Sequence, residues 1–98
     1  METMQNILTR RSVRKFTQDP VSEEAIKTML SAAMVGPTAG NGQTWRFVVV
    51  TDKDLLAKIP TVQKHAYMAT RSAATVIVCA DSGAEKYEGR EYWVQDCA

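Results

Sequence analysis

The hydrophobic positions of this chain follow two patterns, one with helical spacing and one typical of buried strands. The clearest helical stripe consists of Ile26, Met29, Leu30, Ala33 and Met34. Ser22 precedes this stripe and is a suitable N-cap, while Gly36 and Pro37 follow it as stop signals. We therefore predict a helix that begins after Ser22 and ends before Gly36.

Shorter patterns predict the other elements. Met4, Ile7 and Leu8 make residues 2–9 a short amphipathic helix, and the stretch from there to Pro20 lacks periodicity and is expected to be extended. Apolar, β-branched runs predict strands at 45–51 and 74–80, with Trp45 and Phe47 in the core. The remaining expected elements are a helix over 53–59 capped by Asp52 and stopped at Pro60, helical structure over 61–72, a polar loop over 81–91 and the start of a helix at 92–98.

The alternation of strands and helices favours a mixed α/β domain. Both strands are apolar on both faces, which is typical of strands inside a larger sheet covered by helices. Two strands and a few helices do not supply that cover. We therefore expect the 98 residues to be part of a larger domain. Alone, the chain is expected to aggregate or to form an intertwined oligomer.

Composition narrows the class of protein. The chain is 45% hydrophobic and 23% charged, as in ordinary globular domains, and its apolar runs are too short to cross a membrane. Two cysteines and one histidine do not make a disulfide framework or a zinc site. A reduced, cytoplasmic protein without a metal is expected.

The net charge of +1 conceals a basic cluster near the N-terminus. Residues 1–15 hold Arg10, Arg11, Arg14 and Lys15 against Glu2 alone, while the rest of the chain has eight basic and ten acidic residues. Guanidinium groups bind phosphate through paired hydrogen bonds, and Ser12 adds a hydroxyl donor. A solvated basic turn is the alternative. A nucleic-acid-binding domain is a weaker one, because the pI is only about 7.8 and no aromatic residues are interleaved with the arginines.

The 37–43 loop, Pro37 to Gln43, is the second candidate. Its small residues would let a flat ligand approach the backbone, and Asn41 and Gln43 offer amide groups suited to the edge of a heterocycle. The alternative is a simple connection between a helix and a strand. The glycines at 36, 40 and 42 do not match the dinucleotide-binding pattern, and the chain has neither a P-loop nor a nucleophile elbow. His65 has no evident catalytic partner.

Taken together, these segments resemble the FMN-dependent nitroreductase family. The resemblance runs from about Ile7 to Ala98 and rests on RRSVRKF, on AAMVGPTAGNGQTWRFVVV, on ATVIVCAD and on YWVQDCA. It implies an α+β fold with a central, mainly antiparallel sheet flanked by helices, in an intertwined homodimer with FMN at the interface. FMN would accept a hydride from NAD(P)H and pass electrons by a ping-pong mechanism to a nitroaromatic, a quinone or a similar acceptor. No nucleic-acid or membrane partner is expected.

The resemblance also implies roles for single residues. Arg10, Arg11 and Ser12 would bind the FMN phosphate side, and Arg14 would lie near the pyrimidine edge of the flavin and stabilise negative charge there. The residues expected to line the ring from the partner subunit are Pro37, Thr38, Ala39 and Asn41. Gln63 would add a further polar flavin contact, and no catalytic acid or base is named.

Two departures from the family pattern bear on these expectations. Thr44 stands where the family usually has proline, so the resemblance does not establish that the 37–43 loop is rigid. The chain also stops where the family's long central helix begins. The resemblance thus makes residues 1–98 the N-terminal portion of a nitroreductase-like domain, and alone they are expected to oxidise NAD(P)H slowly. A truncated member that binds flavin or assists assembly without turnover is therefore the alternative function.

Overall fold

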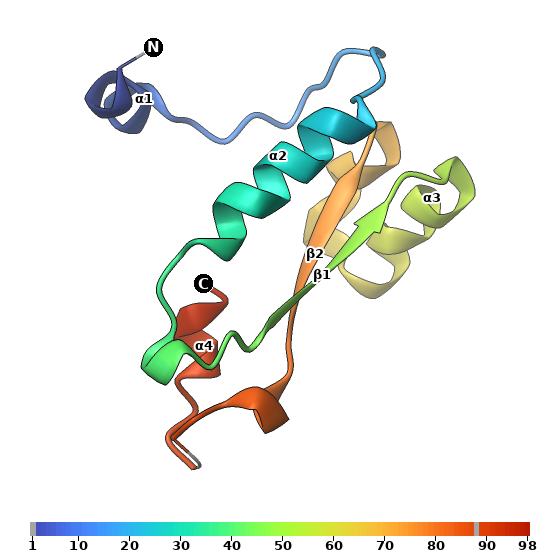
Figure 1. Cartoon of the computed structure of the whole chain (residues 1–98). Helices are drawn as coiled ribbons and strands as arrows, with labels where there is room; N and C mark the ends of the chain where they lie inside the picture. Colours follow the sequence, from blue (N-terminus) through green and yellow to red (C-terminus); the bar gives the residue numbers. More distant parts are fainter. Residues whose placement is uncertain (1, 88) are drawn as a thin grey trace.

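The fold contains a two-stranded antiparallel sheet with helices around it (Figure 1). The computed structural model describes residues 2–87 and 89–98. β1 (Trp45–Val50) pairs with β2 (Thr75–Ala80) in a register that places Trp45 opposite Ala80 and Val50 opposite Thr75. Both predicted strands are confirmed, and their flanking helices make the fold α+β.

α2 (Glu23–Met34) lies alongside the two strands (Figure 1). The Ser22 hydroxyl accepts a hydrogen bond from the backbone N–H of Ala25 at 3.0 Å, which satisfies one of the free donors of the first turn. Both predicted ends of this helix are confirmed. After it, η1 (Ala39–Asn41) forms a single turn before β1.

α3 (Lys53–Val62) and η2 (Lys64–Arg71) follow β1 and precede β2 in the chain, and they pack against each other. They supply the buried apolar side chains Leu56 and Ala69. The prediction that α3 stops at Pro60 is wrong. Proline removes its own N–H from the helical ladder and crowds the preceding turn, but the N–H of Gln63 still closes the last turn on the carbonyl of Ile59 at 3.0 Å.

The two chain ends differ in how they are anchored. α1 (Thr3–Thr9) confirms the predicted N-terminal helix, but its apolar residues Met4, Ile7 and Leu8 are 63%, 64% and 75% exposed. The extended stretch after it is also exposed, and residues 12–21 make no hydrogen bonds with other residues that the structure describes. At the other end, η3 (Ser82–Ala84) and α4 (Trp93–Asp96) fold back beside the 37–43 loop (Figure 1).

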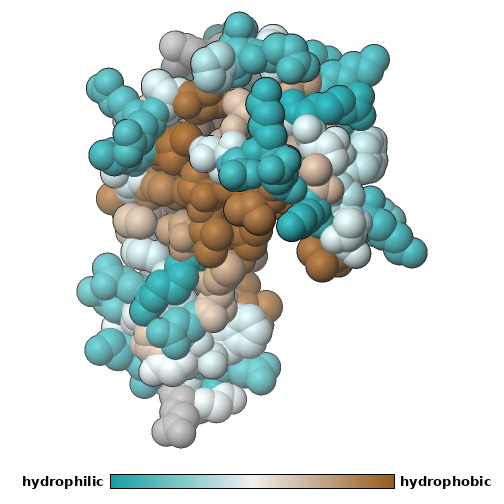
Figure 2. Space-filling view, turned by 90° about the vertical axis from the view of Figure 1, so that its right-hand side faces the viewer, coloured by the Kyte–Doolittle hydropathy of each residue, from teal (hydrophilic) through white to brown (hydrophobic). Residues whose placement is uncertain are grey.

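The sheet is only partly covered. Trp45 and Phe47 stack at 5.8 Å between ring centroids and line a small cavity with Ala33 of α2, so they are half-buried rather than in the core as predicted. On the opposite face, Val48 and its cross-strand neighbour Ile77 are exposed. Figure 2 shows hydrophobic surface gathered across the middle of the face that it draws.

No helix in the described part of the chain is both long enough and apolar enough to cross a membrane.

Candidate functional site

The 37–43 loop has a backbone that only certain residues tolerate. Gly40, Asn41 and Gln43 all have positive φ, at 60°, 56° and 53°. A Cβ atom on Gly40 would lie 2.9 Å from side-chain atoms of both Lys86 and Tyr87, so glycine is required there by contact as well as by conformation. The loop is therefore packed tightly against the segment that follows η3.

Asp96 of α4 holds both sides of the 37–43 loop. Its Oδ1 accepts a hydrogen bond from the backbone N–H of Ala39 at 3.2 Å, and its Oδ2 accepts one from the Thr44 hydroxyl at 3.4 Å. Thr44 is fully buried. Thr44 thus replaces the family's usual proline with a hydroxyl that makes a bond proline cannot make.

Two further hydrogen bonds involve the loop. The Thr38 hydroxyl accepts a hydrogen bond from the N–H of Gln43 at 3.1 Å, which joins the loop to itself. The Arg46 guanidinium donates to the carbonyl of Gln43 at 2.9 Å, which joins the loop to β1. The same guanidinium forms an ion pair with Asp81, the residue after β2, at 3.2 Å.

The basic cluster lies on the exposed stretch that follows α1. Arg10, Arg11, Ser12 and Arg14 are all exposed. Within residues 2–87 and 89–98 the ion pairs are Lys27–Glu23 and Arg46–Asp81, so no carboxylate neutralises these arginines. Guanidinium groups without a partner are available to bind an anion.

The structure does not bring the two predicted halves of the site together in one chain. In Figure 1 the blue stretch after α1 lies near the top of the view, while the green turn before β1 lies near the bottom. Pro37, Thr38, Ala39 and Asn41 do lie together, in the one loop. Gln63 lies elsewhere, between α3 and η2, where its Oε1 accepts from the N–H of His65 at 3.5 Å.

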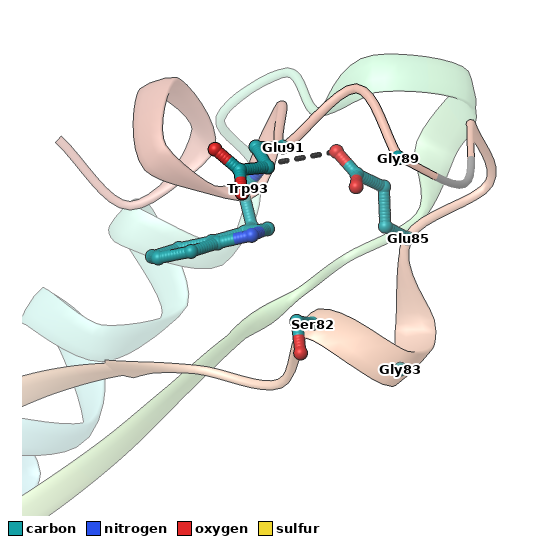
Figure 3. Close-up of a pocket in the computed structure, with 6 residues that line it drawn as sticks. All are labelled: Ser82, Gly83, Glu85, Gly89, Glu91 and Trp93. Atoms are coloured by element: carbon teal, nitrogen blue, oxygen red, sulfur yellow. Dashed lines mark hydrogen bonds between the residues drawn. The ribbon is translucent and has the colours of Figure 1, made fainter.

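A polar pocket of about 580 Å³ lies between η3 and the start of α4 and is lined by residues from Ser82 to Trp93 (Figure 3). Glu85 and Glu91 contribute carboxylates to it, and Glu85 accepts a hydrogen bond from the N–H of Trp93 at 3.1 Å. The pocket contains none of the residues predicted to bind a cofactor. Its negative charge would repel a phosphate, so we do not assign the predicted site to it.

Asp96 is the site residue that sequence reasoning missed. It lies 52 residues from Thr44 and 57 from Ala39. No local motif links such distant positions, and an aspartate near a helix end is usually solvated. The polarity of Thr44 at the start of an apolar strand was the one available signal.

Comparison with known proteins identifies the family to which the chain belongs. The family model described as the nitroreductase family matches residues 7–93. A "Putative NADH dehydrogenase/NAD(P)H nitroreductase" of Methanothermobacter thermautotrophicus is 43% identical over 98 residues, which is 100% of this chain and 50% of that protein. The nitrobenzene nitroreductase of Ectopseudomonas oleovorans is 41% identical over 63 residues, covering 64% of this chain and 27% of its own length.

Solved structures agree with the fold. The FMN-dependent nitroreductase of Clostridium difficile R20291 superposes with a TM-score of 0.80 at 25% identity, covering 91% of this chain and 50% of that one. The chain therefore spans about half the length of the relatives that it matches.

Proposed function

Because the chain belongs to the nitroreductase family, we propose that it forms part of an FMN-dependent oxidoreductase that uses NAD(P)H. The observation that carries this proposal is the set of exposed arginines without a carboxylate partner among the described residues. Their chemistry fits a phosphate, and the 37–43 loop fits a flat ring. When bound, FMN would accept a hydride from NAD(P)H and pass electrons to a nitroaromatic, quinone or similar acceptor.

The arginine stretch would hold the phosphate end of FMN. Arg10 and Arg11 would donate to phosphate oxygens in a forked geometry, and the Ser12 hydroxyl would add a short hydrogen bond. Arg14, further along the same extended stretch, would place a cation beside the pyrimidine edge of the ring. A positive charge there stabilises negative charge on the ring, most strongly where water is excluded.

The 37–43 loop would cover the ring from a second subunit. The arginine stretch and this loop lie far apart in one chain, so a single copy does not surround a ligand with both (Figure 1). A homodimer in which each subunit lends its loop to the partner's arginines would complete two equivalent sites. The exposed apolar residues of α1 and of the sheet are consistent with such an exchange.

Replacing Arg10 tests the proposal. Arg10→Ala should weaken FMN binding about tenfold or more, because a charge-assisted hydrogen bond contributes ~1.5–3 kcal/mol. The measurement is a titration that follows flavin fluorescence. Lys15→Ala is the matched control, since it removes a nearby positive charge from the same exposed stretch without touching a proposed contact. Equal affinities for Arg10→Ala and the unsubstituted chain would refute the assignment.

A flavin-binding module without turnover is the second candidate. The observation in its favour is that the chain spans about half the length of its relatives. Two measurements separate the candidates: the visible absorption of the purified chain reports bound flavin, and NAD(P)H oxidation reports turnover. Bound flavin without oxidation supports the module, whereas oxidation at a rate typical of flavin reductases supports the enzyme.

A further inference from the structure

We propose that Asp96 is a positioning residue that fixes the 37–43 loop in its ligand-binding conformation, an inference that rests on the proposed FMN site. Its two carboxylate oxygens bind opposite ends of one short segment, the N–H of Ala39 and the hydroxyl of Thr44. The residues between those two ends include Asn41, which is proposed to contact the flavin.

The burial of this contact makes it effective. Thr44 is completely enclosed, and both hydrogen bonds are at least partly buried. Removing the carboxylate would leave the buried Thr44 hydroxyl without its protein acceptor. A buried polar group without a partner is unfavourable, so the surrounding backbone would rearrange.

The conformation that Asp96 holds is one that the loop does not favour by itself. Asn41 and Gln43 carry side chains yet have φ values of 56° and 53°. Asparagine adopts left-handed backbone more readily than most residues with side chains, whereas glutamine does so only where surrounding contacts impose it. The bond from Ala39 to Asp96 lies directly before Gly40, the first residue of the loop with positive φ, and the bond from Thr44 lies directly after Gln43, the last one.

α4 has a second, separate attachment that provides a matched control. The Glu85 carboxylate accepts from the N–H of Trp93 at 3.1 Å, at the first residue of the helix. Glu85→Ala therefore loosens α4 without removing either bond to the loop. Asp96→Asn is the conservative variant, because an asparagine can accept from the N–H of Ala39 and donate to the Thr44 oxygen.

The experiment combines amide exchange without FMN and titration with FMN. In Asp96→Ala, the amide of Ala39 and its neighbours in the loop should exchange about tenfold faster, and FMN affinity should fall about tenfold. Asp96→Asn should retain most of both properties. Glu85→Ala should change exchange in α4 while leaving loop exchange and FMN affinity near those of the unsubstituted chain.

The outcomes separate this inference from the proposed function. Unchanged loop exchange in Asp96→Ala overturns the inference, as does an equal loss of FMN affinity in Glu85→Ala and Asp96→Ala. If the unsubstituted chain binds no FMN, the proposed function fails. Loop exchange then decides the role of Asp96 alone: a tenfold rise supports it as the residue that fixes the loop, and no rise refutes it.

Discussion

Gly40 is the residue at which conformation and packing demand the same amino acid. Its φ is 60°, and a Cβ atom would lie 2.9 Å from Lys86 and Tyr87. Gly89 has a similarly positive φ of 79°, yet a Cβ atom there would meet nothing within 4 Å. Substitutions at these two glycines therefore distinguish the free-energy cost of left-handed backbone, present at both, from the cost of a steric clash, present only at Gly40.

We predict that Gly40→Ala destabilises the chain by ~2–5 kcal/mol, since strain of ~1–2 kcal/mol adds to overpacking of ~1–3 kcal/mol. Gly89→Ala should lose only the strain, ~1–2 kcal/mol. Chemical denaturation measures both free energies of unfolding. Equal losses in the two variants would show that the 37–43 loop can move away from Lys86 and Tyr87 at little cost.

The sequence alone identified the residues of the 37–43 loop but not Asp96, the residue that binds the loop. Pro37, Thr38, Ala39 and Asn41 were identifiable because they are adjacent and form a motif. Asp96 was not, because its partners are 52 and 57 residues away. Gln63 was predicted as a flavin contact, but its side chain caps η2 and no described contact joins it to the loop.

At the scale of elements, two helices depend on side-chain caps of different strength. Ser22 accepts one backbone N–H at the start of α2, whereas Asp52 accepts two at the start of α3, from Asp54 at 2.8 Å and Leu55 at 3.2 Å. A carboxylate at this position also interacts favourably with the positive end of the helix dipole.

We predict that Asp52→Ala costs ~1–2 kcal/mol of stability and that Ser22→Ala costs ~1 kcal/mol or less. Ser31→Ala, within α2 and exposed, is the control and should not destabilise, because alanine has the higher helix propensity. Thermal and chemical unfolding check the order. A larger loss for Ser22→Ala than for Asp52→Ala would contradict it.

The sequence predicted where elements lie better than how deeply they are buried. Local signals such as caps, the Gly36-Pro37 stop and β-branched runs placed both strands and α2. Pro60 misled because a proline disturbs only the turn before it, and the turn after it closes through the N–H of Gln63 and the carbonyl of Ile59. The burial of Trp45 and Phe47 was overestimated, because burial depends on what covers the sheet and not on the strand itself.

At the scale of the whole molecule, the chain exposes far more surface than a compact protein of its size. Its accessible surface is 7996 Å², whereas a compact monomer of 10.9 kDa has about 5,600 Å². Its radius of gyration is 15.5 Å, against about 12.6 Å for a compact domain of 98 residues. Much of this surface is apolar, as in Figure 2, and such surface favours association.

We therefore predict that the 98-residue chain associates in solution and that the sheet face contributes. The paired variant Val48→Glu with Ile77→Lys places opposite charges across the strands and should lower the apparent mass in sedimentation. Val62→Lys, at a position already 87% exposed at the end of α3, should leave the mass unchanged. A monomer before any substitution would refute the prediction.

FMN binding and dimerisation should also be linked. If each site needs residues from two subunits, FMN binds the dimer more tightly and shifts the equilibrium toward it by mass action. Sedimentation with increasing FMN should show a rising dimer fraction. A monomer that holds one FMN per chain would exclude the shared site.

The unbonded stretch between α1 and α2 has an entropic consequence for cofactor affinity. Residues 12–21 form no hydrogen bonds with other described residues, so binding must order backbone that is not already held by hydrogen bonds. Fixing one backbone residue costs ~1–2 kcal/mol, which is comparable with the ~1.5–3 kcal/mol gained from one charge-assisted hydrogen bond. Much of the attraction between the arginines and a phosphate would thus be offset by lost chain entropy. Any contact that orders this stretch in advance, even one remote from the phosphate, should therefore strengthen FMN binding.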